Sequence, residues 1–581
     1  MLTKRTQYKP EETDTKKRLR LLPGIIIVII QWLAWYLFPT LIPDDIVMLI
    51  GVAGSLLGGI ALVVWWAFFS RARWFDRVGA ILLMAVSLYA VSFLLDKSIA
   101  TSNMGLMLIM YSIPVMCLVF VVGMVATKRL PPAIRRITMV FAILAAAGLW
   151  VFLRTDGMNG VGQHELNWRW AKSAEERLLE QSGILSASNS LSVSDEPAVA
   201  EWPGFRGKGR NSTIYGTNLG SDWATNPPKE IWRKPVGPGC SSFAIRGNLF
   251  YTQEQRGDFE LVSCYTMETG EPVWQHQDSV RFWDSHAGAG PRSTPTLDGN
   301  RVYTMGGTGL LNVLNATDGS LIWTRDAAAD AGVKVLTWGF TSSPLVVGDV
   351  VIVALAGKLA AYDTADGTPR WFGEDGGSGY SSPQLFVFGN APQVLLMSAA
   401  GAVSVDPSTG NQLWNYSWPI EDRILQPALI GEEDLLLSQE YTGVRRVAVS
   451  KNDQGYTITE DWTSTEMKVN FNDQVIHEGY AYGFDGPSLA CIDLKDGKRM
   501  WKGDRYRGWI LLLADQDLML ILSEKGEVAL VEAIPEKFTE LGRIKAIEGK
   551  TWNHPAMAGN VLLIRNSEKM AAYRLPSKTN K

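Results

Sequence analysis

The chain has 581 residues, which is too long for one ordinary domain, and a formal net charge of −4 at pH 7. A chain so close to neutrality lacks the basic surplus of a typical nucleic-acid-binding protein, so we expect no nucleic-acid partner. Residues 21–153 are almost continuously apolar, whereas the remainder is rich in strand-forming residues separated by turns. The composition therefore predicts a multi-domain protein, with a membrane part followed by a soluble, strand-rich part.

The apolar part, 21–153, is predicted to be a helical domain with five transmembrane helices. Each candidate approaches the ~20 apolar residues that a helix needs to cross the hydrocarbon core. The candidates are Leu21–Ile42, Ile46–Ser70, Val78–Leu95, Met104–Ala126 and Ile137–Leu153. None contains an ionisable side chain of the kind that transporters and proton pumps keep inside the membrane. A membrane anchor is therefore favoured, and contact with quinone or lipid is the alternative.

Basic residues gather on alternate sides of these spans. They lie in the N-terminal tail 1–20 (Lys4, Arg5, Lys16, Lys17, Arg18, Arg20), in the second loop (Arg71, Arg73, Arg77) and in the fourth loop (Lys128, Arg129, Arg135, Arg136). The positive-inside rule then makes the tail cytoplasmic, and five crossings leave everything after Leu153 outside. We expect a multi-pass protein of the cytoplasmic (inner) membrane with a periplasmic or otherwise extracytoplasmic second half.

Residues 154–201 are predicted to connect the two parts. His164–Gln181 has helical spacing, and Ser173 followed by Glu176 is typical of a capping box. Ser186–Ala200 is rich in Ser, Ala and acidic residues, as flexible tethers are. In the entry segment 202–229, Trp202 and Phe205 stand among glycines and basic residues. Packing on the following domain is favoured for this segment, with a ligand-contacting loop as the alternative.

An eleven-residue phrase recurs five times in the second half. Its copies are Cys264–Trp274, Val313–Trp323, Ala361–Trp371, Ser404–Trp414 and Cys491–Trp501. Each has Gly seventh and Trp eleventh, which predicts a hairpin turn with positive φ at the glycine and a strand that presents the Trp. The pairs are Gly270 and Trp274, Gly319 and Trp323, Gly367 and Trp371, Gly410 and Trp414, and Gly497 and Trp501. A period of 40–50 residues is typical of propeller blades.

A second repeated theme, a Ser/Pro step followed by two strands, extends the count to eight units within a domain at 230–575. They begin near residues 240, 290, 341, 380, 425, 472, 507 and 552, and Trp462 falls where the Trp of the fifth belongs. The last unit lacks its final strand, while Glu230–Val236 is a lone strand before the first unit. We expect this strand to complete the last blade and so remove an exposed sheet edge. Residues 576–581 remain as a C-terminal tail.

The repeated phrase resembles the tryptophan-docking motif of the PQQ-type, quinoprotein-like, eight-bladed β-propellers. The resemblance covers about residues 202–575 and implies that each Trp packs on the Gly turn of a neighbouring blade. One branch contains pyrroloquinoline quinone (PQQ) dehydrogenases, some with membrane spans. Another contains non-catalytic propellers, such as the propeller lipoprotein of the BAM outer-membrane assembly complex. The layout of this chain looks most similar to membrane-anchored members with unassigned roles.

The dehydrogenase branch implies a Ca²⁺ site, an Asp base and a vicinal Cys–Cys pair over the quinone. The four cysteines here, Cys117, Cys240, Cys264 and Cys491, are not adjacent, and the five histidines show no metal-ligand spacing. No catalytic or metal-binding residue is therefore assigned. PQQ and Ca²⁺ are expected only under the alternative, a membrane dehydrogenase that oxidises a sugar or alcohol and reduces membrane quinone.

Seven residues that precede innermost strands are predicted to rim the central channel. They are Trp283, His286, Arg292, Trp338, Tyr380, Asn553 and His554. Polar capping of strand ends is the favoured interpretation, and a mouth that binds a peptide or small molecule is the alternative. The whole pattern favours a non-catalytic binding and assembly scaffold in the cell envelope, with a protein or peptide partner at a propeller rim.

Overall fold

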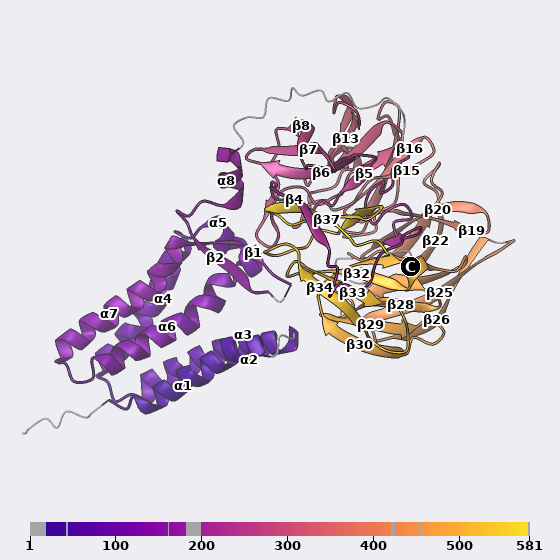
Figure 1. Cartoon of the computed structure of the whole chain (residues 1–581). Coiled ribbons are helices and arrows are strands. Elements are labelled where there is room, and N and C mark those ends of the chain that lie inside the picture. Colours follow the sequence, from indigo (N-terminus) through magenta and orange to yellow (C-terminus); the bar gives the residue numbers. More distant parts are fainter. Residues whose placement is uncertain are drawn as a thin grey trace, which may run out of the picture. The chain divides into compact units, whose positions relative to one another are not determined.

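The computed structural model describes residues 19–41, 45–160, 162–181, 199–419, 424–440, 442–453 and 455–578. The chain divides into two compact units. The first comprises Met1–Thr155 and Leu166–Arg169, and the second comprises Asp156–Glu165 and Trp170–Lys581. Figure 1 follows the chain from the indigo helices of the first unit to the yellow strands at the end of the second.

The first unit is helical. Its elements are α1 (Leu22–Trp32), η1 (Leu33–Leu37), α2 (Phe38–Leu41), α3 (Asp45–Val64), η2 (Trp65–Phe69), α4 (Trp74–Ser92), α5 (Lys97–Thr101), η3 (Ser102–Gly105), α6 (Met107–Ala126), α7 (Pro132–Gly148) and η4 (Leu149–Phe152). Trp65, Trp66 and Phe120 are buried between the helices. Large apolar side chains also face outward, and Phe68, Phe75 and Phe141 are 71%, 84% and 71% exposed. An apolar outer surface of this kind suits a helix bundle in lipid.

The prediction of five spans is wrong by one. Four described helical segments are long and apolar enough to cross a membrane: Leu49–Phe69, Trp74–Ser92, Met107–Ala126 and Pro132–Phe152. The first predicted span instead contains a shorter apolar helix at Leu22–Leu37. At 1.5 Å per residue such a helix covers about 24 Å, less than the ~30 Å hydrocarbon core. Most of the basic N-terminal tail lies outside the described residues.

The second unit is an eight-bladed β-propeller, so this part of the predicted fold class is confirmed. Blade 1 consists of β5 (Ala244–Arg246), β6 (Leu249–Arg256), β7 (Phe259–Thr266) and β8 (Pro272–Asp278). Blade 2 consists of β11 (Thr296–Asp298), β12 (Arg301–Met305), β13 (Leu310–Asn315) and β14 (Leu321–Asp326). Blade 3 consists of β15 (Leu345–Val347), β16 (Val350–Leu355), β17 (Lys358–Asp363) and β18 (Pro369–Phe372). Blade 4 consists of β19 (Gln384–Phe388), β20 (Ala391–Ser398), β21 (Gly401–Val405) and β22 (Gln412–Ser417).

The second half of the ring repeats this antiparallel order. Blade 5 consists of β23 (Ala428–Ile430), β24 (Asp434–Gln439), β25 (Gly443–Asn452) and β26 (Gly455–Ser464). Blade 6 consists of β27 (Val475–His477), β28 (Tyr480–Asp485), β29 (Ser488–Asp493) and β30 (Arg499–Arg505). Blade 7 consists of β31 (Gly508–Leu513), β32 (Leu518–Ser523), β33 (Glu527–Glu532) and β34 (Glu540–Lys545), and the short β3 (Thr213–Ile214) adds to it in parallel. Blade 8 consists of β35 (Ala556–Ala558), β36 (Val561–Arg565), β37 (Lys569–Arg574) and β4 (Lys229–Pro235).

Strand β4 closes the ring, as the lone strand in the sequence predicts. It pairs antiparallel with β37, and Trp232 lies opposite Ala572 in the register. In Figure 1 the magenta β4 lies beside the yellow β37. Because β4 and β37 lie at opposite ends of the domain in sequence, their pairing joins those ends and leaves blade 8 with four strands.

Tryptophans of successive blades lie on glycine turns of the next blade. A Cβ built on these glycines would fall 2.4–2.9 Å from indole carbons, so only glycine fits. The pairs are Trp232 on Gly270, Trp274 on Gly319, Trp323 on Gly367, Trp371 on Gly410 and Trp462 on Gly497. Trp414 and Trp501 differ because the blades that follow them lack the Gly–Trp phrase. Trp414 donates to Gln393 of its own blade at 2.7 Å, and Trp501 donates to the Ile534 carbonyl at 2.8 Å.

The predicted helix at His164–Gln181 is only partly right. Its first residues form the strand β2 (His164–Trp168), which pairs with β1 (Leu153–Met158), and the helix α8 covers Ala174–Gln181. The capping box explains where the helix starts. Ser173 N–H donates to Glu176 at 2.6 Å, and Glu176 N–H donates to Ser173 Oγ at 3.1 Å. The predicted Ser-rich tether lies mostly outside the described residues.

Candidate functional site

Hydroxyl side chains link neighbouring blades from blade 1 to blade 4 by hydrogen bonds. The Ser242 N–H donates to Thr294 Oγ1, the Thr294 N–H to Ser343 Oγ and the Ser343 N–H to Ser382 Oγ, each at 3.0 Å. These residues belong to the repeated Ser/Pro step, which therefore satisfies buried backbone donors at the three junctions from blade 1 to blade 4. The repetition of this step in the sequence has a structural cause.

The entry segment inserts two arginines among the innermost strands. Arg206 is completely buried, and its Nε and Nη2 donate to Ser212 Oγ and the Gln474 carbonyl, both at 3.0 Å. Its guanidinium lies 3.5 Å from the Asp473 carboxylate, and burial lowers the pKa of Arg206 from its usual value. Trp202, 2% exposed, exchanges backbone hydrogen bonds with Ile245 of blade 1. The segment is thus tied to blades 1 and 6.

Arg210 ties the same segment to blades 2, 3 and 4. Its Nη1 donates to the Ser343 and Pro383 carbonyls at 3.1 and 2.9 Å, and its Nη2 donates to Thr296 Oγ1 at 3.4 Å and to the Pro344 carbonyl. Burial lowers the pKa of Arg210 to about 9. In the part of the chain that the structure describes, no carboxylate pairs with this guanidinium.

Three of the seven predicted rim residues lie close together in the structure. The rings of Trp338 and Tyr380 are 4.9 Å apart, and those of His286 and Trp338 are 6.1 Å apart. Burial lowers the pKa of His286, which keeps its ring neutral near pH 7. We call His286, Trp338 and Tyr380 the mouth cluster. Aromatic rings with polar edges are the side chains that most often anchor a bound protein or peptide.

Two other rim residues hold the loop that presents His286. Trp283 begins the short strand β9 (Trp283–Asp284), which pairs with β10 (Gly288–Ala289). Arg292 is buried and donates to the Asp284 carboxylate and to the Gly288 carbonyl. These contacts within the loop stabilise its conformation.

Asn553 and His554 do not join the mouth cluster. The Asn553 amide donates to the Gly239 and Ser241 carbonyls at 2.9 and 2.7 Å, which ties blade 8 to blade 1. His554 lies against the entry segment, with Nε2 at 3.0 Å from Ser212 Oγ. Burial lowers the pKa of His554 to about 3, so its ring is neutral. Both side chains make contacts that hold the fold.

A hairpin tip beside the mouth cluster, Asp156–Glu165, was not predicted from the sequence. It belongs to the propeller unit. The Met158 N–H donates to the His286 carbonyl at 3.1 Å. The Gly160 N–H donates to Glu524 Oε1, which also accepts from Trp552 Nε1 at 2.7 Å, and Arg507 donates to the Gly160 carbonyl. Three glycines between residues 157 and 162 signal this turn, but the helical spacing that follows obscured it.

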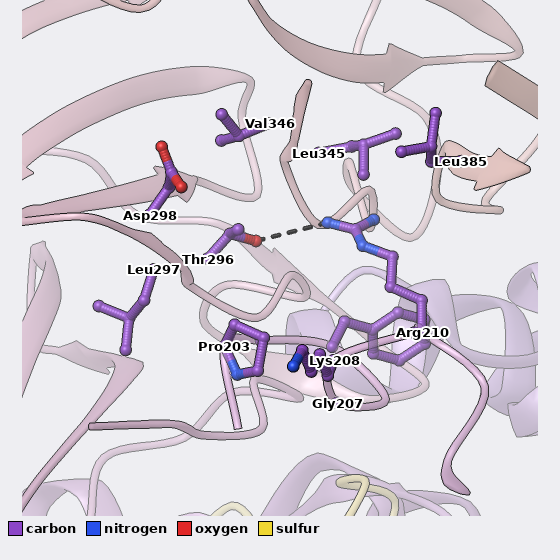
Figure 2. A pocket seen from close by; sticks show the side chains of 13 residues that line it. Pro203, Gly207, Lys208, Arg210, Thr296, Leu297, Asp298, Leu345, Val346 and Leu385 are labelled. Atoms are coloured by element: carbon purple, nitrogen blue, oxygen red, sulfur yellow. Dashed lines mark hydrogen bonds between the residues drawn. The ribbon is translucent and has the colours of Figure 1, made fainter. Parts of the chain in front are cut away.

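A pocket of about 340 Å³ opens between the entry segment and blades 2 to 4. Figure 2 shows it from close by. It is lined by the loop at 203–210, by Thr296, Leu297 and Asp298, by Leu345 and Val346, and by Leu385. Most of these side chains are apolar, while Lys208, Arg210 and Asp298 bring charge. The sequence indicated the entry segment as a ligand-contacting loop only in the alternative interpretation, and it gave no sign of the other walls, which come from three separate stretches further along the chain.

The residues present do not fit the cofactors of the quinone-dependent alternative. Among described residues, the group able to offer a metal ion three ligand atoms is His477, Glu478 and Asp517, in which His477 Nε2 lies 2.7 Å from Asp517 Oδ1. This group lies in turns of blades 6 and 7. Near the mouth cluster, the Asp284 carboxylate already accepts a hydrogen bond from Arg292. The Glu524 carboxylate already accepts from Trp552 and Gly160. We therefore assign no reaction that uses PQQ or Ca²⁺ to these residues.

Comparison with known proteins matches the propeller part of the chain to one family of propellers. A family model described as outer membrane protein assembly factor BamB matches residues 258–503. The predicted resemblance to the PQQ-type propeller repeats of BamB is confirmed. The BamB of Yersinia pestis is 23% identical over 321 residues, which cover 52% of this chain and 70% of that protein. The BamB of Burkholderia pseudomallei is 23% identical over 359 residues, which cover 58% and 85%.

Solved structures similar to this BamB-like propeller are more distant. BamB from Moraxella catarrhalis is 14% identical with a TM-score of 0.44, over 61% of this chain and 99% of that one. Quinohemoprotein alcohol dehydrogenase from Comamonas testosteroni is 11% identical with a TM-score of 0.49, over 65% and 81%.

Proposed function

We propose that this protein is a membrane-anchored, extracytoplasmic scaffold that binds protein partners during assembly in the bacterial cell envelope. The observation that carries the proposal is the match of the BamB family model to residues 258–503 of a closed propeller. The relatives are named for outer membrane protein assembly, and we extend that role to this chain. A rigid ring with loops on two faces suits the holding of partners, although a fold alone does not define a function.

The charges of the helical unit support the orientation in this proposal. Arg71 and Arg73 lie between the first two long apolar segments, and Lys128 and Arg129 lie between the last two. The positive-inside rule places both loops in the cytoplasm, so the chain after Phe152 lies outside. This conclusion does not depend on the shorter helix at Leu22–Leu37. That helix must cross only if the basic N-terminus is also cytoplasmic.

The mouth cluster is the docking surface we favour. Trp338 offers a large, rigid, half-buried ring backed by Tyr380, which is 7% exposed, and the backbone of the His286 loop already binds a turn of the protein's own chain at Met158. A partner segment would find the same aromatic and backbone groups beside the hairpin tip. We therefore place the partner contact at the loops before β15 and β19.

Photocrosslinking in living cells tests this function. A photoreactive amino acid would replace Trp338 at the mouth, and in a matched strain Leu321, which is 47% exposed on β14. We expect a discrete crosslinked protein from position 338 and none from position 321. We also expect a strain without the protein to carry less assembled outer membrane protein. Normal assembly together with equal crosslinking from both positions would contradict the scaffold function.

A further inference from the structure

The pocket in Figure 2 combines apolar walls with unbalanced positive charge. Leu345 and Leu297 are 7% and 5% exposed, whereas Leu385 is 36% exposed and leaves part of the wall open to solvent. Pro203 and Phe205 of the entry segment form the facing wall. A concave apolar surface of this size can enclose a small hydrophobic group.

Two cations and one anion line this pocket. The Arg210 guanidinium is buried, and its four terminal N–H groups are used by three carbonyls and Thr296 Oγ1. It therefore acts as a fixed positive charge behind the wall. The Lys208 side chain is exposed at the pocket, and within the described part of the chain its ammonium has no hydrogen-bond or ion-pair partner. Asp298 carries the opposing charge, and Figure 2 shows it on the other side of Thr296 from Arg210.

The net charge of the pocket lining indicates the charge of the ligand. The lining has a net charge of +1, from Lys208 and Arg210 against Asp298. A ligand with one negative charge would neutralise it, whereas a doubly charged phosphate would exceed it. Burial of Arg210 without a paired carboxylate also lowers its pKa, and a nearby anion would relieve that cost.

We propose that this pocket binds an apolar group that ends in a carboxylate. The apolar part lies against Leu345, Leu385 and Pro203, and the carboxylate accepts a hydrogen bond from the Lys208 ammonium. Such a group could be a free acyl carboxylate or the C-terminal residue of a peptide chain. The site does not depend on the scaffold function, because it lies at the entry segment and not at the mouth cluster.

Binding is measured on the full chain in lipid nanodiscs, with empty nanodiscs as the blank. The probes are 4-methylpentanoate and N-acetylglycylleucine, each with its neutral amide as a matched control. Calorimetry and saturation-transfer NMR report the dissociation constants. We expect saturable binding of at least one acid, about fivefold tighter than its amide, as one exposed ion pair allows. If only the peptide acid binds, the ligand is a chain terminus, and if both acids bind, it includes free acyl carboxylates.

Substitutions of exposed residues locate the site without threatening the fold. We expect Lys208→Gln to weaken acid binding about fivefold and to remove the preference over the amide. Lys334→Gln removes an equally exposed charge elsewhere and should leave binding unchanged. Leu385→Asp should weaken binding about tenfold because it adds a negative charge to the pocket, and that charge repels the ligand's carboxylate. Val387→Asp places the same charge on the same exposed face of β19 but outside the pocket, and it should not weaken binding. Equal affinity for acid and amide, equal effects of the paired variants, or no saturable binding would overturn the proposal.

Discussion

At the scale of single residues, a glycine in each repeated turn accepts the tryptophan of the preceding blade. Gly319 has φ +74°, and a Cβ there would lie 2.4 Å from the Trp274 ring. The Trp274 indole N–H also donates to the Ala316 carbonyl of the same turn at 3.1 Å. The glycine therefore meets two demands at once, a left-handed backbone and room for an indole.

Two alanine substitutions separate these demands. Gly348 has φ +60° and no atom within 4 Å of a built Cβ, so Gly348→Ala costs only the backbone strain of about 1–2 kcal/mol. Gly319→Ala adds overpacking against Trp274, worth about 1–3 kcal/mol more. We expect urea unfolding of the propeller to show this order. Equal losses of stability in the two variants would mean that the Trp contact adds nothing.

His554 makes stability depend on pH. Its pKa is lowered from 6.5 to about 3 in the folded state, so below pH 6.5 the unfolded chain binds a proton that the folded chain does not. The contribution of His554 to the free energy of unfolding is fully present above pH 6.5 and falls as the pH drops towards 3. At pH 5 the loss is about 2 kcal/mol. Glu260, whose burial raises its pKa to about 7, acts in the opposite direction over part of this range.

The contribution of His554 is therefore measured as a difference between variants. We expect His554→Gln to lose less stability than the wild type when urea unfolding at pH 7 is compared with pH 5. His276→Gln, which keeps His554, should retain the wild-type pH dependence. An unchanged dependence in His554→Gln would show that other groups carry the acid sensitivity.

At the scale of elements, two segments outside the blades are built into the propeller. The entry segment does so through buried Arg206 and Arg210, and the hairpin tip does so through Met158 and Gly160. Both belong to connections that sequence patterns describe poorly, because their partners lie hundreds of residues away. One carboxylate, Glu524, accepts from both Gly160 of the tip and Trp552.

Removing that carboxylate should release the tip. Glu524→Ala leaves the Gly160 N–H and the Trp552 indole without their acceptor, and we expect amide hydrogen exchange at residues 157–160 to become about tenfold faster. Glu527→Ala is the matched control, because Glu527 contacts Arg543 and not the tip. Unchanged exchange in the Glu524 variant would show that the other contacts suffice to hold the tip.

At the scale of the whole molecule, closure of the ring by β4 and the apolar surface of the helical unit define two different environments. The propeller joins its first and last strands in one sheet, whereas the helices expose large apolar side chains. The two units present different surfaces, and the basic loops between the long apolar segments support the extracytoplasmic side that we propose for the second unit.

Reporter fusions test this arrangement in cells. We expect alkaline phosphatase fused after Lys581 to be active, because it needs an oxidising compartment, and a cytoplasm-dependent fluorescent protein at the same place to be dark. The same pair fused before Met1 reports whether the helix at Leu22–Leu37 crosses. A fluorescent C-terminal fusion with inactive phosphatase would place the propeller in the cytoplasm and contradict the proposed orientation.

The sequence by itself determined the blades and their number. A blade is a set of adjacent hairpins, so turn glycines such as Gly270 and the tryptophans four residues later reveal it locally. Even the closing strand β4 was predictable, because one blade lacked a strand and one strand lacked a blade. The four long apolar segments were visible in the same way, whereas the length of the first helix was not.

The tertiary structure was needed to show which of the predicted rim residues lie together. The seven rim residues looked alike in sequence, yet His286, Trp338 and Tyr380 form the mouth cluster while His554 turns towards Ser212 of the entry segment. For the pocket beside Lys208, the sequence indicated only the entry-segment wall, as the alternative interpretation of that segment, and not the walls that other stretches supply. Contacts of this kind join residues far apart in the chain, and no local pattern records them, because they depend on how the closed ring brings separate loops together.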